Sequence, residues 1–286
     1  MGTDRIATGV TASPGEVLTV FVDAPEGDPL PSVVFTQHIG HWSSWKGGST
    51  ALSRGINFVT VPNLYKDGWS TPTVPGGPVY LTDPYTDDEQ SANVRVYIDG
   101  GHTFPLYRAG GDVRAFEDAL DAYAEEMAQT ELPDVAEVQS DNVLLTLSAT
   151  GVRAFVERGG DVRHTCSAWD SYLKKLYAFD GIAMSPGGAH YDERAPYLNV
   201  NIRLMQPYGA AYAYGDHVGI QSSWEGTALD ATEFGWGYTH ELGHMMDIPE
   251  RTVGEYTNNM WSQYDRVTRE GQPARGDFAA FTLRMT

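Results

Sequence analysis

The sequence predicts an α+β protein, with an N-terminal antiparallel β-sandwich over residues 1–108 followed by a mixed α/β domain over residues 109–286. Three observations favour this class. Short β-rich runs between Gly, Pro and Asp clusters fill residues 16–98. The first amphipathic helical pattern begins near residue 112. Helical and β-like segments then follow one another along the second domain.

Five runs of the first domain are predicted as strands, and their regular spacing and frequent turn residues favour an antiparallel sandwich. The loops between them carry Trp42, Trp45 and Trp69, which we interpret as packing residues rather than as a platform for sugar rings. The acidic run 87–89 is interpreted as a solvated surface rather than a calcium site. The predicted strands are 16–22, 32–36, 57–61, 78–81 and 93–98.

The second domain opens with a helix predicted over residues 112–129, because its apolar residues recur at helical spacing. A buried strand is predicted over 142–147 and a helix over 166–178, followed by β-like segments over 198–204 and 210–220. The apolar residues of the first helix are Val113, Phe116, Leu120, Tyr123 and Met127.

The composition excludes several classes of protein. With 286 residues and 41% hydrophobic content the chain can bury a sizeable core. The formal net charge of -19 argues against nucleic acid or an anionic membrane surface as partner. A single cysteine, Cys166, permits no intramolecular disulfide, and we interpret it as a packing residue.

No apolar signal segment opens the chain and no run of apolar residues is long enough to span a membrane. We therefore expect either a cytosolic protein or a domain cut from a longer secreted one, and we expect a monomer.

The pattern His-Glu-x-x-His at residues 240–244 organises the rest of the sequence. On a helix, His240 and His244 project from one face, so that two imidazoles converge on one point. This is half of a tetrahedral zinc site. Glu241 is placed to take a proton from metal-bound water and is the expected general base.

The third ligand decides the class of metal site. A metzincin would continue with a third His, but Asp247 and Glu250 stand at the positions where that pattern requires Gly and His. Pro249 ends the first helix, and Glu255 on a second helix is the expected third ligand. Asn259, four residues on, would share its helical face and orient a ligand imidazole. Water would hold the open fourth position.

The reaction also needs a donor that stabilises the developing oxyanion. Tyr238, Tyr256, Tyr214 and His217 are all candidates. We favour Tyr214 and His217, because the segment 210–220 would be an edge strand that pairs with an extended substrate in the cleft.

The motif and its surroundings resemble the enhancin-like, mucin-degrading zinc peptidases, whose pattern is His-Glu-x-x-His, a short gap, and Glu followed by Thr-Asn-Asn. The resemblance is carried by Gly-Trp-Gly-Tyr-Thr-His-Glu-Leu-Gly-His at 235–244 and Gly-Glu-Tyr-Thr-Asn-Asn at 254–259. Upstream, the stretches 8–10, 14–16 and 98–107 are similar to the β-sandwich subdomain of that family.

This resemblance implies a gluzincin (thermolysin-like) catalytic domain behind a β-sandwich, in a secreted or surface-displayed zinc endopeptidase that cuts O-glycosylated mucin-type proteins. It implies that His240, His244 and Glu255 are zinc ligands and that Glu241 is the general base. Trp224 and Arg203 are hypothetical sugar contacts, chosen only because they stand close to the cleft in sequence.

Two other hypotheses stay open. One is a zinc peptidase that acts on bare polypeptide without a glycan requirement. The other is a glycan-binding or adhesion module with a vestigial site. Trp224 would fit simple core packing equally well.

Overall fold

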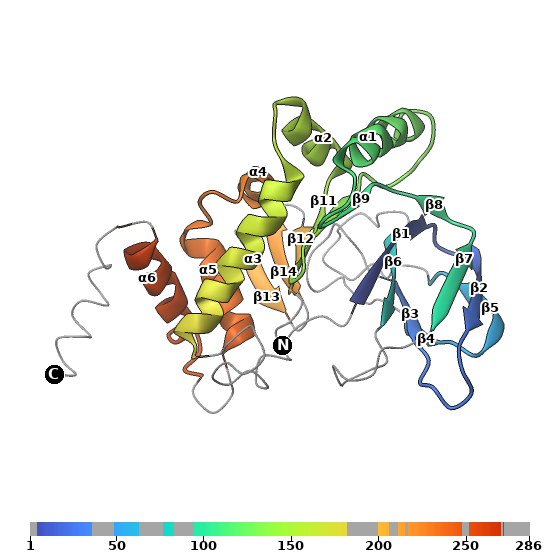
Figure 1. The fold of residues 1–286 in the computed structure, drawn as a ribbon, viewed down its shortest axis with the longest axis horizontal. Helices are drawn as coiled ribbons and strands as arrows, with labels where there is room; N and C mark the ends of the chain where they lie inside the picture. Colours follow the sequence, from blue (N-terminus) through green and yellow to red (C-terminus); the bar gives the residue numbers. More distant parts are fainter. Residues whose placement is uncertain are drawn as a thin grey trace, which may run out of the picture.

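The structure is a computed structural model of the chain (Figure 1). It describes residues 5–35, 49–62, 77–82, 94–181, 200–205, 211–214, 217–247, 252–269 and 271. Three predicted packing residues and the predicted acidic surface lie outside these ranges, namely Trp42, Trp45, Trp69 and the run 87–89.

Two antiparallel sheets form the N-terminal part of the molecule. One contains five strands in the order β4-β3-β6-β1-β8, and the other contains three in the order β5-β2-β7. The strands are β1 (Arg5–Ala12), β2 (Val17–Asp23), β3 (Ser32–Phe35), β4 (Ser49–Ala51), β5 (Gly55–Thr60), β6 (Gly77–Thr82), β7 (Arg95–Asp99) and β8 (His102–Thr103).

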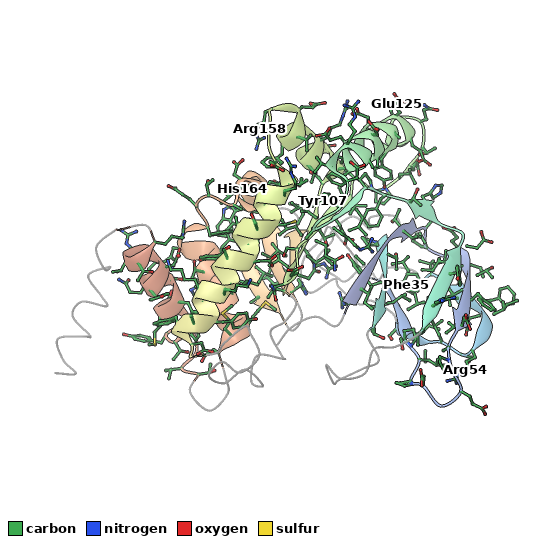
Figure 2. All side chains as sticks on the ribbon, in the orientation of Figure 1. Phe35, Arg54, Tyr107, Glu125, Arg158 and His164 are labelled. Carbon is green, nitrogen blue, oxygen red and sulfur yellow. The ribbon has the colours of Figure 1, made fainter. Side chains whose placement is uncertain are left out.

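The two sheets are held together by one apolar cluster that follows from strand alternation. Along β2, Leu18, Val20 and Val22 are buried while the residues between them face outward. Their side chains belong to the same cluster as Val33 and Phe35 of β3 in the other sheet (Figure 2). Each of the five predicted runs overlaps an observed strand in this region.

Strand β1 is not among the five predicted runs, and its geometry explains why. Gly9 lies in its centre with φ +72°, and the register with β6 shifts between Ala7 and Val10. A glycine in the left-handed region at such a shift marks a β-bulge, which reads as a turn in a sequence pattern.

A six-stranded mixed sheet, ordered β13-β14-β12-β11-β10-β9, forms the centre of the second part. Strand β9 already belongs to this sheet, so the change from one sheet to the next occurs before the predicted division at residue 108. The strands are β9 (Leu106–Arg108), β10 (Ala136–Gln139), β11 (Val143–Leu147), β12 (Val200–Met205), β13 (Ala211–Tyr214) and β14 (His217–Gln221).

Six described α-helices and one 3-10 helix accompany this sheet (Figure 1). The predicted helix at 112–129 is confirmed, and Asp112 caps it by accepting hydrogen bonds from the backbone of Arg114 and Ala115. The helices are α1 (Val113–Met127), α2 (Ala149–Glu157), α3 (Val162–Phe179), α4 (Glu225–Asp230), α5 (Gly235–Met246), α6 (Asn258–Thr268) and the 3-10 helix η3 (Ser222–Trp224).

The main core lies between the helices and one face of the six-stranded sheet. Leu145 of β11, Ile202 of β12 and Ile220 of β14 pack there in one cluster with Trp169 of α3 and Leu242 of α5. The free Cys166 is buried beside this core, as predicted. None of the described helices is both long and apolar enough to cross a membrane.

The opposite face of the same sheet carries buried polar side chains and is covered by the N-terminal part. Tyr80 of β6 donates a hydrogen bond to Glu137 of β10, and its hydroxyl lies 3.3 Å from that of Thr146 on β11. Thr146 also donates to Glu137 at 2.9 Å, and Asn201 of β12 donates to Thr146 at 3.1 Å. The metal motif therefore lies on the other side of the sheet, the side that packs against the helices.

Candidate metal centre

Helix α5 presents the His-Glu-x-x-His motif beside the edge of the six-stranded sheet. His240 and His244 lie one helical turn apart, and their ring centroids are 4.9 Å apart at an interplanar angle of 87°. Glu241 is buried between the helix and the sheet, with 9% of its surface exposed.

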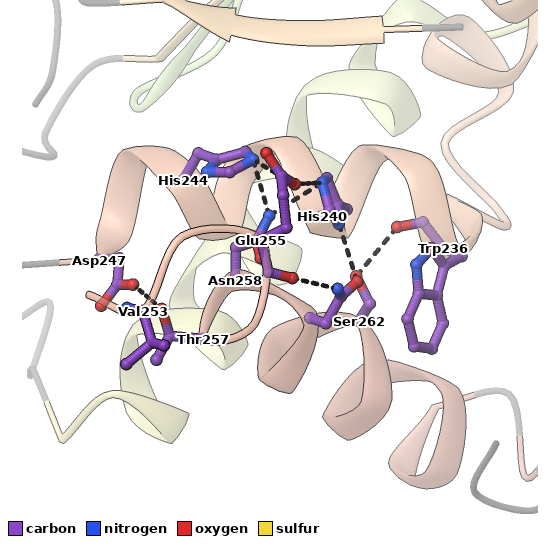
Figure 3. Close-up of polar contacts among 10 residues, drawn as sticks. Trp236, His240, His244, Asp247, Val253, Glu255, Thr257, Asn258 and Ser262 are labelled. Atoms are coloured by element: carbon purple, nitrogen blue, oxygen red, sulfur yellow. Dashed lines mark hydrogen bonds and ion pairs between the residues drawn. The ribbon is translucent and has the colours of Figure 1, made fainter. Parts of the chain in front are cut away.

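Glu255 completes a triangle of ligand atoms with the two imidazoles (Figure 3). Its Oε2 lies 2.9 Å from His240 Nε2 and 3.2 Å from His244 Nε2. In a tetrahedral zinc site with ligand bonds of about 2.1 Å, neighbouring ligand atoms are about 3.4 Å apart. These distances and the N, N, O donor set therefore fit a divalent metal such as zinc.

The sequence predicted Glu255 on the second helix, but in the structure this residue lies in a turn before that helix. Gly254 has φ +48° and the backbone of Tyr256 donates to the carbonyl of Val253, so the chain turns here and α6 begins only at Asn258. The left-handed glycine leaves the Glu255 side chain 76% exposed, pointing at the imidazoles from the solvent side.

Two carboxylates compete for the role of third ligand, since an oxygen of Glu241 also lies within 4.8 Å of the imidazole ligand atoms. The contacts favour Glu255, which lies close to both Nε2 atoms. Slight burial would raise the pKa of Glu255, but His244, His240 and a hydrogen bond from Asn258 outweigh it and lower the pKa. Glu255 thus stays ionised, as a ligand requires.

The pKa of Glu241 is raised, chiefly by burial and also by the charge of Glu255. The neighbouring His240 and a hydrogen bond from the backbone N–H of Ala213 oppose this rise. A carboxylate with a raised pKa is a stronger base than an exposed one, so Glu241 is suited to accept a proton.

Asn259 fixes the orientation of one ligand imidazole. Its Oδ1 lies 2.8 Å from His240 Nδ1, and its Nδ2 donates to the backbone carbonyl of Glu255. Because an amide oxygen can only accept, Nδ1 carries the proton and Nε2 keeps its lone pair toward the metal position. This is the geometry that the i, i+4 spacing suggested, although Glu255 itself is not helical.

Asn258 was not foreseen as a site residue. It is fully buried, and its Nδ2 lies 2.9 Å from His240 Nε2 and 2.7 Å from His244 Nε2. In the sequence, Asn258 is marked only by its place next to Asn259. Neighbouring residues on a helix point in different directions, so the spacing predicts that Asn258 does not share the contacts of Asn259.

Among the described strands, β13 lies at the edge of the six-stranded sheet, next to α5. The backbone of Ala213 in this strand donates a hydrogen bond to the carboxylate of Glu241, so the strand and the motif helix are in direct contact. The backbone of Tyr214 ends the strand, whereas its side chain lies outside the part of the structure that is described.

The structure does not bring His217 or Arg203 together with the imidazoles. His217 is 2% exposed, and its Nε2 lies 3.1 Å from the hydroxyl of Tyr212. It alternates with Val218, which packs toward the helices, so its ring lies on the opposite face of the sheet. Arg203 is 3% exposed on that same face, where its charge opposes the rise that burial causes in the pKa of Glu137.

These positions do not support the expected roles of the two residues, for a physical reason. A side chain on a strand reaches only one face of its sheet, and a buried guanidinium on the covered face cannot contact a substrate at the metal. Proximity to the cleft strand in sequence therefore does not place Arg203 and His217 beside the imidazoles.

Trp224 ends the 3-10 helix η3 and packs against the motif helix α5. Its indole covers Gly237, where a Cβ atom would come within 2.1 Å of the ring. Tyr238 donates a 2.8 Å hydrogen bond to the carbonyl of Trp224 and is buried. Tyr238 is therefore committed to packing, whereas Trp224 is half-buried and Tyr256 is exposed beside Glu255.

Two imidazoles, an exposed carboxylate beside them and a separate buried carboxylate match the type of centre that metal-dependent hydrolases use. The sequence profile of peptidase M60, enhancin and enhancin-like, matches residues 100–276. This is more than half of the chain, which therefore belongs to the peptidase M60 family.

Solved structures support this assignment. The catalytic module of the metalloprotease ZmpA from Clostridium perfringens is 27% identical with a TM-score of 0.81, over 98% of this chain and 56% of that one. The M60 catalytic domain of ZmpC from the same organism, in complex with the sialyl T antigen, is 25% identical with a TM-score of 0.79, over 94% and 53%. A metallopeptidase from Bacteroides thetaiotaomicron shares the fold at 14% identity, with a TM-score of 0.64 over 96% and 44%.

The chain thus spans about half the length of the Clostridium chains that it matches. No curated protein matches the sequence.

Proposed function

We propose that this chain is the catalytic part of a zinc-dependent endopeptidase of the gluzincin type. The observation that carries the proposal is the convergence of Glu255 Oε2 on both imidazole Nε2 atoms, with the buried Glu241 beside them. His240, His244 and Glu255 would hold the ion.

A bound zinc ion would supply a Lewis acid and lower the pKa of its water. Glu241 would accept the proton of that water at its carboxylate and pass it to the leaving amine. Asn259 would keep His240 in the tautomer that the ion needs. The backbone bond from Ala213 would hold Glu241 in place as it changes charge.

We also propose that the edge strand β13 pairs with an extended segment of the substrate, because the backbone of Ala213 on this strand contacts Glu241. Tyr214, at the end of this strand, remains our proposed oxyanion donor. Trp224 remains a proposed substrate contact, since its half-buried indole covers the helix one turn before Glu241.

The proposed substrates are O-glycosylated, mucin-type glycoproteins. Two observations support this class, namely the resemblance of the motif region to mucin-degrading peptidases and the similarity to a ZmpC domain that was solved with the sialyl T antigen. On the same grounds we propose a secreted or surface-displayed protein that acts as a monomer. We propose residues 1–108 as a β-sandwich subdomain and 109–286 as the catalytic domain, with β9 (Leu106–Arg108) as the connecting strand that already pairs with the six-stranded sheet.

Digestion of an O-glycosylated mucin-type glycoprotein tests the proposal. One sample keeps its O-glycans, a second loses them enzymatically, and a third contains a zinc chelator. Fragments only from the glycosylated, zinc-replete sample are expected. Equal cleavage of both glycoforms would instead indicate a peptidase without a glycan requirement, and binding without cleavage would indicate a glycan-binding module.

A further inference from the structure

The side-chain amide of Asn258 occupies a position that the mechanism above does not use. Asn258 is the first residue of α6 and is fully buried. Its Nδ2 lies within hydrogen-bond distance of both ligand imidazoles, at 2.9 Å from His240 and 2.7 Å from His244. The same amide donates to the carboxylate of Glu255. Figure 3 shows the two contacts with the imidazoles, and with the bond to Glu255 one group contacts all three proposed metal ligands.

The chemistry of these contacts separates the carboxylate from the imidazoles. An imidazole nitrogen that binds a metal uses its lone pair for that bond and no longer accepts a hydrogen bond. A carboxylate keeps further lone pairs when one oxygen binds a metal. With a metal present, Glu255 is thus the ligand to which the amide of Asn258 can still donate.

Glu255 needs such a partner more than the histidines do. The imidazoles are carried by a regular helix, whereas Glu255 lies in a turn and its side chain is 76% exposed. A freely rotating carboxylate loses conformational entropy when it binds a metal, and a fixed donor reduces that loss. Asn258 is itself held firmly, because its backbone packs against Gly243 of α5.

We propose that Asn258 is a positioning residue for the metal centre: its buried amide donates to Glu255 and holds this exposed carboxylate against the two imidazoles. The inference rests on the proposed zinc site, and it gives α6 a second role beside that of Asn259. Asn259 orients His240, whereas Asn258 orients the carboxylate.

Substitution of Asn258 by leucine provides the test, because leucine has the same branched shape without a donor. Zinc affinity is measured by competition with a chelator, and the Co²⁺-substituted protein is compared by its absorption spectrum. We expect Asn258→Leu to bind zinc about 10- to 100-fold more weakly and to change the Co²⁺ spectrum. Ser262→Ala is the matched control, since Ser262 lies one turn further on α6 and donates to the Trp236 carbonyl.

An Asn258→Leu protein with a native circular dichroism spectrum and the zinc affinity of the parent would overturn the proposal. A parent chain that binds no zinc would instead refute the zinc site itself, so the two failures are distinguishable.

A second measurement on the unsubstituted chain applies if Asn258→Leu does not fold. In NMR spectra, zinc should shift the side-chain amide protons of Asn258 and slow their exchange with solvent, while those of Asn57 in β5 stay unchanged. Side-chain protons of Asn258 that exchange rapidly and do not respond to zinc would also overturn the proposal.

Discussion

Glu241 and Glu255 lie beside the same pair of imidazoles, yet their surroundings separate their properties. Burial raises the pKa of Glu241, while the histidine charges lower that of Glu255. The exposed carboxylate therefore suits metal ligation and the buried one suits proton transfer. A pair of carboxyl groups with pKa values displaced in opposite directions is a common sign of divided roles in an active site.

Replacement of Glu241 by glutamine tests this division at the residue scale. The amide has the same shape but cannot accept the proton, so turnover should fall by about 10²- to 10⁴-fold. Zinc content, measured by atomic absorption, should stay at the level of the parent because the three ligands remain. Turnover near that of the parent would refute the assigned base.

At the scale of elements, the site depends on how closely α5 and α6 approach each other. A Cβ atom at Gly243 would lie 2.6 Å from the carbonyl oxygen of Asn258 and 2.9 Å from its Cα. Both atoms belong to the backbone, which cannot move aside cheaply. The absence of a side chain at Gly243 is therefore what lets Asn258 and Asn259 reach the imidazoles.

Gly243→Ala should accordingly push the two helices apart. We expect a loss of about 1–3 kcal/mol in the free energy of unfolding, typical of overpacking, together with weaker zinc binding. Gly226→Ala in α4 is the control, because a Cβ there meets no atom within 4 Å. The control should be neutral or slightly stabilising in denaturant unfolding. An unchanged midpoint for Gly243→Ala would contradict this account of the contact.

At the scale of the whole molecule, a buried polar layer joins the N-terminal sheets to the back of the metal-bearing part. Glu137 lies in this layer, where burial raises its pKa to about 7. Hydrogen bonds from Tyr80 and Thr146 and the charges of Arg203 and Arg108 oppose the rise. The junction between the two parts is thus sensitive to the protonation of one carboxyl group.

This raised pKa predicts a pH-dependent stability. Between its ordinary value of 4.5 and about 7, Glu137 binds more protons in the folded than in the unfolded chain. Its contribution is therefore present at low pH and is lost as pH rises through 7, up to about 3 kcal/mol by the size of the shift. Denaturant unfolding at pH 5 and pH 8 measures this loss.

Glu137→Gln should remove much of this difference, because the amide stays neutral at both pH values. Glu125→Gln, at an exposed position on α1 (Figure 2), should leave the difference as in the parent. The same pH dependence in the parent and in Glu137→Gln would show that another group causes it.

Local patterns allowed several elements and much of the candidate site to be predicted. The helix at 112–129 and the five N-terminal runs follow from apolar spacing. The convergence of His240 and His244 follows from helical geometry over four residues. Glu255 was predicted as the third ligand from its position downstream of the first helix. The left-handed conformation of Gly254, which places Glu255 in a turn, was not predicted.

What the sequence by itself determined is therefore the set of short-range features: the strands, the helices, and the motif that places two imidazoles and a base on one helix. Only the tertiary structure decided the rest, including the contacts of Asn258 and the position of His217 and Arg203 on the covered face of the sheet. The physical reason is the separation along the chain over which each kind of interaction acts. Helix and strand periodicity act between neighbours, whereas these positions depend on packing between elements that lie far apart in the chain.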